Sequence, residues 1–439
     1  MSEFSRRDLF KIGAGAAAGG ALGLPGEAAA QATEWKTAPE KGAKLRVMRP
    51  SKFVQGDETL FIENTKKYQQ QTGVEVKIDF EGWEDLVPKT AVSANVGKGA
   101  DIVYGWHDLA HQFPDKLVNL TDVATYLGNK YEGWYPLAQR YGKRGNNWIQ
   151  VPLGASGGKM NYRKSMVKAA GFDTIPLDFP GFLKFAAAAK EKAKPVGFAL
   201  GHAVGDGNTY THWLLWGFGG KIVDDKDNVV INSPETIAAL EYAKQLYPLM
   251  IPGTLSWLDP SNNKAFLDGQ ISATLNGISI YYVAKNSTDP ALKAIAEDMD
   301  HAPYPVGPSG KPGEICTMVS AMLFKYCKYP NAAKDYIRFM MEKEQLDPFL
   351  EAAIGYWGHP LKYYEKNKIW TSDPKITPFK EVISRCLWLG YSGSMGYASA
   401  SAVADYIVVD MFAAASSGDK SPKDAAAEAQ KRAERYYKI

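Results

Sequence analysis

The sequence predicts an α/β protein made of two lobes that exchange segments of chain. Short β-type runs alternate with helical stretches from Leu45 to Tyr104, a pattern typical of a parallel sheet covered by helices. Two glycine-rich segments far apart in the chain, 154–158 and 303–313, indicate places where it crosses between lobes. A length of 439 residues is enough for two or three domains with full hydrophobic cores.

The individual elements follow from the spacing of apolar residues and from their stop signals. Leu60, Phe61 and Tyr68 recur at helical spacing, and Thr72-Gly73 ends that helix. Residues 74–80 alternate apolar and polar side chains, as a half-buried strand does. The predicted strands are 45–49, 74–80, 101–104 and 149–153, and the predicted helices are 58–71, 86–96, 179–194 and 234–249. From about residue 333 the chain is predicted to be largely helical, with an amphipathic tail from Pro422.

Composition excludes several classes of protein. Apolar residues are 45% and charged residues 23%, values of an ordinary globular chain. The net charge of +3 is too small to argue for nucleic acid or an anionic membrane as partner. Three cysteines without a C-x-x-C pair do not suit zinc or an iron–sulfur cluster, and we expect them to be buried. His107 and His111 lie four residues apart but have no clear third ligand, so neither metal nor cofactor is expected.

Residues 1–32 have the three parts of an export signal. Arg6, Arg7 and Lys11 form a basic patch, an apolar stretch covers 12–24, and small residues lead up to Ala32. The run from Ser5 resembles a twin-arginine signal, which predicts export to the bacterial periplasm with cleavage near Ala32. A general secretion signal that happens to contain two arginines is the alternative. No later segment approaches the run of about 18 consecutive apolar residues that a membrane span needs, so we expect the mature chain to be soluble.

Several short motifs resemble, in order and spacing, those of family 1 extracellular solute-binding proteins, the group that includes maltose-binding protein. The matching segments are Gly99–Tyr104, Trp106–Asp108, Leu117–Asp122, Val151-Pro152, Asn161–Lys164, Gly219-Gly220, Asn232–Glu235, Phe266–Gln270 with Asn276-Gly277, Pro305–Gly310 and Gly355–Pro360. The resemblance covers nearly all of residues 44–435. It departs from the family at Ala100, where proline is usual, and in the Trp106 loop, which is one residue shorter.

The resemblance implies a two-lobed periplasmic-binding-protein fold of type II, with hinge segments and a ligand cleft between the lobes. It places 33–154 and 302–325 in the N-terminal lobe, and 155–301 and 326–439 in the C-terminal lobe. Such a protein closes on its solute by hinge bending and delivers it to the membrane subunits of an ABC importer. It is not an enzyme, and it works as a monomer.

Trp106 and Asp108 are the first candidate ligand residues, because they follow the end of a predicted strand, where open α/β sheets place their ligand crevices. In the matching loop of the family, the Trp and the Asp hold sugar. A buried aromatic residue and a helix-capping aspartate are the structural alternative. Trp83 opens the loop after another predicted strand and is a further candidate.

Ser156 lies in Gly154–Gly158, which fits the G-x-S-x-G pattern of a hydrolase nucleophile. That role needs a strand-to-helix turn, whereas Asn161-Tyr162 predicts another strand, so we expect a hinge or cleft floor with Ser156 near the ligand.

The second lobe offers the remaining candidates. Tyr210, His212 and Trp213 follow a glycine-rich loop at the place where the family has ligand aromatics, although they could equally enter the core. The family often has a stacking Trp two residues after the Asn276-Gly277 step; here that residue is Ser279, and Tyr281 is the nearest substitute. The further candidates are Trp257 with Asp259, Asn276, Gly277 and Trp357.

A carbohydrate or polyol is the expected ligand, because aromatic platforms with carboxylates and amides suit it. A quaternary amine or other small cation in an aromatic cage uses the same residues and stays open as an alternative. An anion would require clustered arginine or a helix N-terminus in these loops. Of another class, an exported cofactor-dependent oxidoreductase would fit the signal, but the chain has no cysteine cluster and no G-x-G-x-x-G after a strand.

Overall fold

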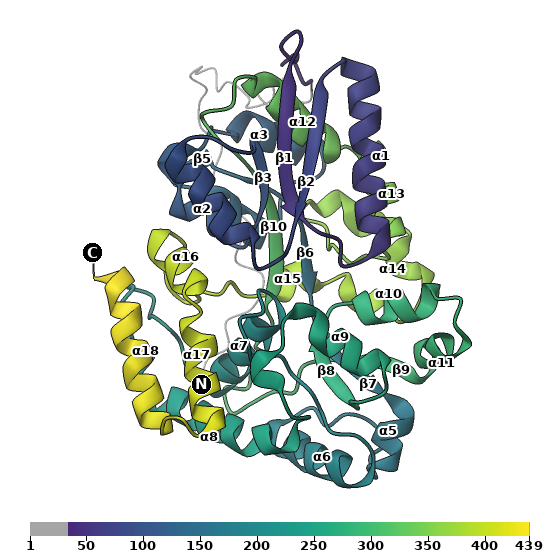
Figure 1. Cartoon of the computed structure of the whole chain (residues 1–439), viewed down its shortest axis with the longest axis vertical. Helices are drawn as coiled ribbons and strands as arrows, with labels where there is room; N and C mark the ends of the chain where they lie inside the picture. Colours follow the sequence, from purple (N-terminus) through teal and green to yellow (C-terminus); the bar gives the residue numbers. More distant parts are fainter. Residues whose placement is uncertain (1–33, 439) are drawn as a thin grey trace, which may run out of the picture.

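Two sheets organise the molecule, one in each lobe (Figure 1). The computed structural model describes residues 34–438, so the predicted export signal lies outside the described residues. The first lobe occupies the upper half of Figure 1 and the second lobe the lower half.

The first lobe is built on a five-stranded sheet of order β2-β1-β3-β10-β6. Its elements are β1 (Lys44–Pro50), α1 (Gln55–Thr72), β2 (Glu75–Glu81), α2 (Leu86–Val96), β3 (Ile102–Trp106), η2 (Leu109–Gln112), α3 (Thr121–Lys130), α4 (Pro136–Gly142), β4 (Lys143–Arg144), β5 (Asn147–Trp148), β6 (Val151–Gly157), β10 (Cys316–Leu323), α12 (Pro330–Met340), α13 (Lys343–Ala352), α14 (Ile369–Ser372) and α15 (Val382–Arg385). The predicted strands and helices of this lobe lie within a few residues of these bounds, and α1 ends at Gly73, whose φ is 72°.

The expectation of a parallel sheet is only partly right. β1 is parallel to β2 and to β3, but β10 is antiparallel to both β3 and β6. The reason is that β10 brings the chain back from the second lobe and β6 takes it there. Both strands therefore belong to crossings and not to the regular strand–helix–strand repeat at the start of the chain.

The second lobe is built on a three-stranded sheet of order β8-β7-β9 whose pairs are both antiparallel. Its elements are β7 (Lys159–Arg163), α5 (Lys164–Ala169), α6 (Phe179–Lys192), α7 (Asp206–Phe218), α8 (Pro234–Leu246), α9 (Asp259–Leu267), β8 (Ala273–Asn276), α10 (Ser279–Asn286), α11 (Pro290–Asp298), β9 (Met299–Ala302), α17 (Ile407–Ser417) and α18 (Pro422–Tyr437). α16 (Tyr397–Ala404) packs against both η2 and α18, so it touches both lobes.

The glycine-rich crossing lies where the sequence predicts it. The chain leaves the first sheet in β6 and enters the second in β7, with Gly158 between them. A Cβ atom at Gly158 would lie 2.2 Å from the hydroxyl of Tyr304 and 3.3 Å from the carbonyl oxygen of Asn276. Only glycine fits there, which lets strands from both lobes and the returning segment 303–315 meet in one place.

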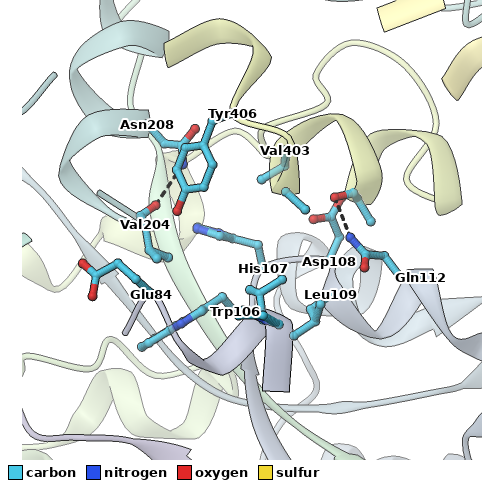
Figure 2. A pocket seen from close by; sticks show the side chains of 14 residues that line it. Glu84, Trp106, His107, Asp108, Leu109, Gln112, Val204, Asn208, Val403 and Tyr406 are labelled. Atoms are coloured by element: carbon cyan, nitrogen blue, oxygen red, sulfur yellow. Dashed lines mark hydrogen bonds between the residues drawn. The ribbon is translucent and has the colours of Figure 1, made fainter. Parts of the chain in front are cut away.

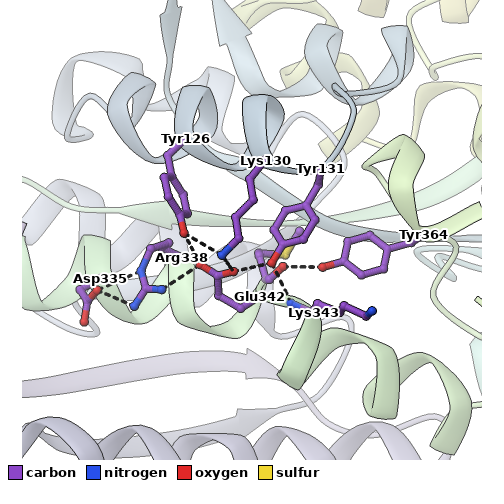
Figure 3. Close-up of polar contacts among 9 residues, drawn as sticks. Tyr126, Lys130, Tyr131, Asp335, Arg338, Glu342, Lys343 and Tyr364 are labelled. Atoms are coloured by element: carbon purple, nitrogen blue, oxygen red, sulfur yellow. Dashed lines mark hydrogen bonds and ion pairs between the residues drawn. The ribbon is translucent and has the colours of Figure 1, made fainter. Parts of the chain in front are cut away.

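The expected boundary at residue 326 is wrong for α12 and α13, which pack against α1 and α3 of the first lobe, and for α15, which packs against α4 and β6. Figure 3 shows the contact that fixes α12 and α13: Glu342 accepts hydrogen bonds from Tyr126, Lys130, Tyr131 and Arg338. The motifs used for the boundary stop at residue 310 and resume at 355. The sequence therefore has no marker for a helical pair that stays with β10 before the chain returns to the second lobe.

α16 and α17 together form an apolar helical stretch long enough to span a membrane, Tyr397–Ser417, but 56% of its apolar 18-residue window is buried inside the molecule. Tyr406, with φ of 50°, separates the two helices, and α17 packs against α7 and α8. The stretch is therefore a core segment. The predicted amphipathic tail is α18, which buries Ala425, Ala426 and Ala429, and the three cysteines are buried as expected.

Candidate functional site

Two adjoining cavities lie where the lobes face each other. The Trp106 cavity has a volume of about 120 Å³ and the Asp206 cavity about 30 Å³. The Trp106 cavity is lined by Glu84, Val87, Pro88, Trp106, His107, Asp108, Leu109, Gln112, Val204, Asn208, Ala400, Val403, Ala404 and Tyr406. The Asp206 cavity is lined by Phe53, Trp83, Ser156, Gly157, Gly158, Gly205, Asp206, Thr209, Asp259, Asn276, Gly277, Thr317 and Tyr356. The smaller one has room for only one or two water molecules, so a larger guest requires the lobes to part.

Five aromatic side chains from separate parts of the chain form a closed ring along the first-lobe side of these cavities. The rings of Trp83 and Trp106 are 4.3 Å apart, and Phe53 lies 4.8 Å from Trp83. Trp357 stacks on Trp106 at 6.5 Å and meets Tyr356 at 4.9 Å, and Tyr356 stacks on Phe53 at 6.2 Å. Because every ring contacts two others, this wall is rigid and presents apolar faces to the cavities.

Two carboxylates from different helices lie together in the Asp206 cavity. Asp259, at the start of α9, accepts hydrogen bonds from the backbone amides of Gly205 (3.0 Å) and Asp206 (2.7 Å), at the start of α7. Burial raises the pKa of Asp259 to about 6. Burial and the neighbouring Asp259 hold the pKa of Asp206 well above its usual range. The pair therefore favours either one retained proton or a donor group of a guest.

His107 occupies the middle of the Trp106 cavity, between Tyr406 and Trp106 (Figure 2). It is 3% exposed, its φ is 47°, and neither ring nitrogen has a hydrogen-bond partner. Burial lowers the pKa of His107 to about 4, so the ring is neutral near pH 7 and can both donate and accept. Glu84, at the edge of the same cavity, also has a buried and unpartnered carboxylate oxygen, Oε1.

Asp108 faces α16 from the other side of the Trp106 cavity. Its Oδ2 accepts a hydrogen bond of 2.9 Å from the hydroxyl of Ser399. The side-chain amide of Gln112 donates to the carbonyl oxygen of Ala400 at 3.0 Å (Figure 2). Burial raises the pKa of Asp108 to about 6.

The lining of both cavities contains acidic, amide, hydroxyl and aromatic side chains but no lysine or arginine. Such a surface can accept hydrogen bonds from hydroxyl or ammonium groups and can pack against C–H faces. It offers no countercharge to an anion. Among residues 34–438 no group of three or more His, Cys, Asp or Glu side chains is arranged to hold a metal ion.

Seven of the residues singled out in the sequence line these cavities, and an eighth lies directly behind them. Trp106 and Asp108 line the Trp106 cavity, and the Asp206 cavity is lined by Trp83, Ser156, Asp259, Asn276 and Gly277. Trp357 stacks behind Trp106. Ser156 is the next-to-last residue of β6, just before the strand-to-strand crossing, so the strand-to-helix turn of a hydrolase nucleophile does not occur here.

The other five do not line either cavity. Tyr210 stacks on Phe198 in the core, and the indole of Trp213 donates to the carbonyl oxygen of Pro305 at 2.8 Å. Tyr281 donates to Asp373 at 2.6 Å. The two that remain are His212, which contacts the carbonyl oxygen of Asn208, and Trp257, which packs over Gly197.

Asp206, Tyr356 and Tyr406 are cavity residues that sequence reasoning missed. Asp206 begins α7, and the aromatic candidates Tyr210 and Trp213 come one and two turns later on the same helix. The glycine-rich loop before α7 could have indicated Asp206. A helix that begins at such a loop has its first turn at the cleft, and its later turns lie further away. Tyr406 has no local signal, because it reaches the cavity only through the path of the C-terminal segment.

Comparison with known proteins gives the family and the fold. The model of the bacterial extracellular solute-binding protein family matches residues 63–378, more than half of the chain. A Deinococcus radiodurans protein named "Probable ABC transporter-binding protein" is 24% identical over 203 residues, which are 45% of this chain and 48% of that protein.

Solved structures of similar fold cover nearly the whole chain. A maltose-bound protein of T. maritima has a TM-score of 0.78 at 18% identity and covers 90% of this chain and 100% of its own. A solute-binding protein of Agrobacterium radiobacter in complex with ribitol has a TM-score of 0.74 at 19% identity, covering 90% and 99%. One of Agrobacterium vitis with bound D-mannitol has a TM-score of 0.73 at 18% identity, with the same coverage. These likenesses confirm the two-lobed α/β fold.

Proposed function

The chain belongs to the bacterial extracellular solute-binding protein family, which binds solutes and is not enzymatic, and on that premise we propose that it is the substrate-binding component of an ABC importer. Its ligand is a carbohydrate or polyol, held between the lobes and passed to the membrane subunits of the permease. The single observation that carries this proposal is the pair of adjoining cavities, which combine a ring of aromatic faces with unpartnered acceptors.

A polyhydroxyl ligand satisfies what the cavities leave open. Asp206, Asp259 and Glu84 offer carboxylate oxygens, and His107 and Asn276 add neutral polar groups. Each hydroxyl of a sugar or polyol both donates and accepts, so it suits a mixed set of this kind. Solved proteins of the same fold hold maltose, ribitol and D-mannitol, which supports the same ligand class.

A small cation is the second candidate. The observation that favours it is the absence of lysine and arginine from a lining that contains four carboxylates. A quaternary or protonated amine would neutralise the Asp206–Asp259 pair and rest against the rings of Trp83 and Trp106.

A thermal-shift screen of the exported protein separates these ligands. The panel contains maltose, D-mannitol, ribitol, choline and glycerol 3-phosphate. A ligand at 100 times its dissociation constant stabilises the folded state by about 2.7 kcal/mol, which is readily seen as a rise in Tm. A hit among sugars or polyols supports the first candidate, and a hit confined to choline replaces it with the second. A hit confined to glycerol 3-phosphate contradicts both.

Hinge closure is part of the proposal. The Asp206 cavity is too small for a sugar, so a ligand enters while the lobes are apart and is enclosed when they meet. X-ray scattering of the ligand-free protein should give a larger radius of gyration than scattering at saturating ligand. Equal radii in the two states would contradict closure.

Export is assigned to residues 1–32. Arg6 and Arg7 direct the folded chain through the twin-arginine route to the periplasm, where cleavage near Ala32 releases it as a monomer. Replacing both arginines by lysine should keep the precursor in the cytoplasm, because a general secretion signal needs positive charge but not arginine. Normal export of that variant would favour the general secretion route.

A further inference from the structure

The C-terminal segment forms one wall of the Trp106 cavity, although it comes from the opposite end of the chain. Ala400, Val403, Ala404 and Tyr406 all line this cavity. α16 itself packs on η2 of the first lobe, while α17 and α18, which continue it, pack on α7 and α8 of the second lobe. The segment therefore connects the two lobes, with α16 against the first lobe and α17 and α18 against the second (Figure 1).

The segment is held at both ends by side chains. On the second lobe, the ring of Tyr406 stacks on His202 at 4.4 Å with nearly parallel planes, and His202 contacts Asp410 at 2.7 Å. On the first lobe, Ser399 donates to Asp108 at 2.9 Å, and Gln112 donates to the carbonyl oxygen of Ala400 at 3.0 Å. Asp108 is 3% exposed and Ser399 is 1% exposed, so neither group can exchange its partner for bulk water while α16 is in place.

Asp108 thus has a partner in the protein itself, unlike His107 next to it. Both ring nitrogens of His107 are unpartnered and face the cavity, whereas the hydroxyl of Ser399 occupies one oxygen of Asp108. His107 is therefore available to a ligand, whereas Asp108 is hydrogen-bonded to α16.

We propose that α16 is a movable strap that closes the Trp106 cavity, and that Asp108 and Ser399 are positioning residues that latch it to the first lobe. In this arrangement Asp108 acts on ligand retention through α16. The proposal rests on the proposed function, because it gives the cavity its ligand. The strap itself can be tested without any ligand.

Hydrogen–deuterium exchange of the ligand-free exported protein is the deciding measurement. Ser399→Ala removes the latch hydroxyl and keeps a residue that favours helix. Exchange of the amides in 397–404 should then rise about tenfold, since one buried hydrogen bond to a charged group is lost, while α17 and α18 exchange as before. Ser399→Thr, which keeps the hydroxyl, should restore slow exchange.

A variant of Asp108 distinguishes the loss of the hydrogen bond between the lobes from the loss of the Ser399 contact at the start of α16. The hydroxyl of Ser399 also accepts a hydrogen bond from the backbone amide of Gly396 at 3.0 Å, a contact within the first turn of α16. Asp108→Ala leaves that contact in place and removes only the bond between the lobes, so it should raise exchange in 397–404 as Ser399→Ala does. Slow exchange in the Asp108→Ala variant would assign the effect to the cap and overturn the latch.

Ser401→Ala is the matched control, because Ser401 lies on the same buried helix and Ser399, not Ser401, is the hydroxyl bonded to Asp108. Equal exchange of α16 in the Ser399→Ala and Ser401→Ala variants would overturn the latch. So would a rise that extends through α17 and α18, because that pattern reports unfolding of the second lobe and not release of a strap.

A second arm tests the consequence for binding with maltose, D-mannitol and ribitol as separate probes. For any probe that binds, Ser399→Ala should raise the dissociation rate more than it lowers the association rate, and Ser399→Thr should restore it. An unchanged dissociation rate would overturn the claim that the strap retains ligand. If none of the three probes binds, the proposed ligand class fails, while the exchange measurement still decides the latch.

Discussion

Glu342 and Asp259 are both deeply buried carboxylates, 4% and 2% exposed. Their surroundings shift their pKa values in opposite directions. Glu342 accepts hydrogen bonds from two tyrosines and two cations, including Lys130 at 2.7 Å and Arg338 at 2.8 Å (Figure 3). Burial alone would raise the pKa of Glu342, but the bonds from Lys130, Tyr131 and Tyr126 outweigh it and hold that pKa below its usual value. Asp259 has only backbone donors and a second carboxylate beside it, and its pKa is raised to about 6.

This difference in hydrogen-bond partners distinguishes groups that stabilise the fold from groups that line the cavities. Burying a polar group without hydrogen-bond partners costs folding free energy. Polar groups that stabilise the fold therefore find all their partners within the protein. The Glu342 network joins α3 to the turn between α12 and α13 and is complete. The set of cavity side chains is incomplete, because both ring nitrogens of His107 and Oε1 of Glu84 have no hydrogen-bond partner and are available to a guest.

The largest expected effect is on the complete network. Glu342→Gln leaves Lys130 and Arg338 without their shared carboxylate, and removing one partner of a buried ion pair costs about 3 kcal/mol of folding free energy. Urea unfolding should show this loss, while ligand affinity stays unchanged. Glu344→Gln, two residues along and exposed, is the control and should cost almost nothing. A loss of affinity at constant stability would erase the distinction between the two regions.

Asp206→Asn should give the opposite result. It removes the acceptor that we propose for the ligand and also relieves repulsion with Asp259, so affinity should fall by about 2 kcal/mol while the stability of the ligand-free protein is unchanged or higher. Calorimetric titration with the ligand found in the screen measures the first quantity and urea unfolding the second. If the variant unfolded more easily and bound as well as before, Asp206 would belong to the fold and not to the site.

The pH dependence of stability should have opposite sign in the two regions. The pKa of Asp259 is higher in the folded than in the unfolded chain, so the folded state binds the extra proton and its stability falls as pH rises from about 4 to 6. The pKa of Glu342 is lowered, so its contribution is present above the usual carboxyl pKa and is lost as pH falls below it.

Unfolding curves from pH 3.5 to 7 for Asp259→Asn and Glu342→Gln, each compared with the unchanged protein, should isolate these slopes. The Asp259→Asn difference should change by on the order of 1 kcal/mol for each pH unit of its window, and the Glu342→Gln difference should change in the opposite sense as pH falls below the usual carboxyl pKa. Parallel curves for the unchanged protein and Asp259→Asn between pH 4 and 6 would show that burial does not raise the pKa of Asp259.

The sequence predicted the strand and helix elements of the first lobe well because each carries its own apolar period and stop signal, such as the glycine after α1. The Trp106–Asp108 loop was also predictable because it lies at the end of a strand, and the Asn276-Gly277 step because it resembles a family motif. The return of α12 and α13 to the first lobe was not, because it depends on Glu342 meeting Tyr126 and Lys130 from a distant part of the chain. The position of Tyr406 in the Trp106 cavity was not predictable either, because it depends on the path of the distant C-terminal segment.

Tyr281 provides the smallest effect and the sharpest check on this division. Its position after Asn276-Gly277 made it a ligand candidate, but its hydroxyl donates to Asp373 at 2.6 Å, within a cluster that also includes Lys285. Tyr281→Phe should therefore cost about 1 kcal/mol of stability through the lost hydrogen bond and change ligand affinity by less than about 0.5 kcal/mol. Calorimetric titration beside Asp206→Asn makes the comparison direct. A larger loss of affinity would mean that α10 carries its aromatic residue to the ligand when the lobes move, and the site would then extend beyond the two cavities.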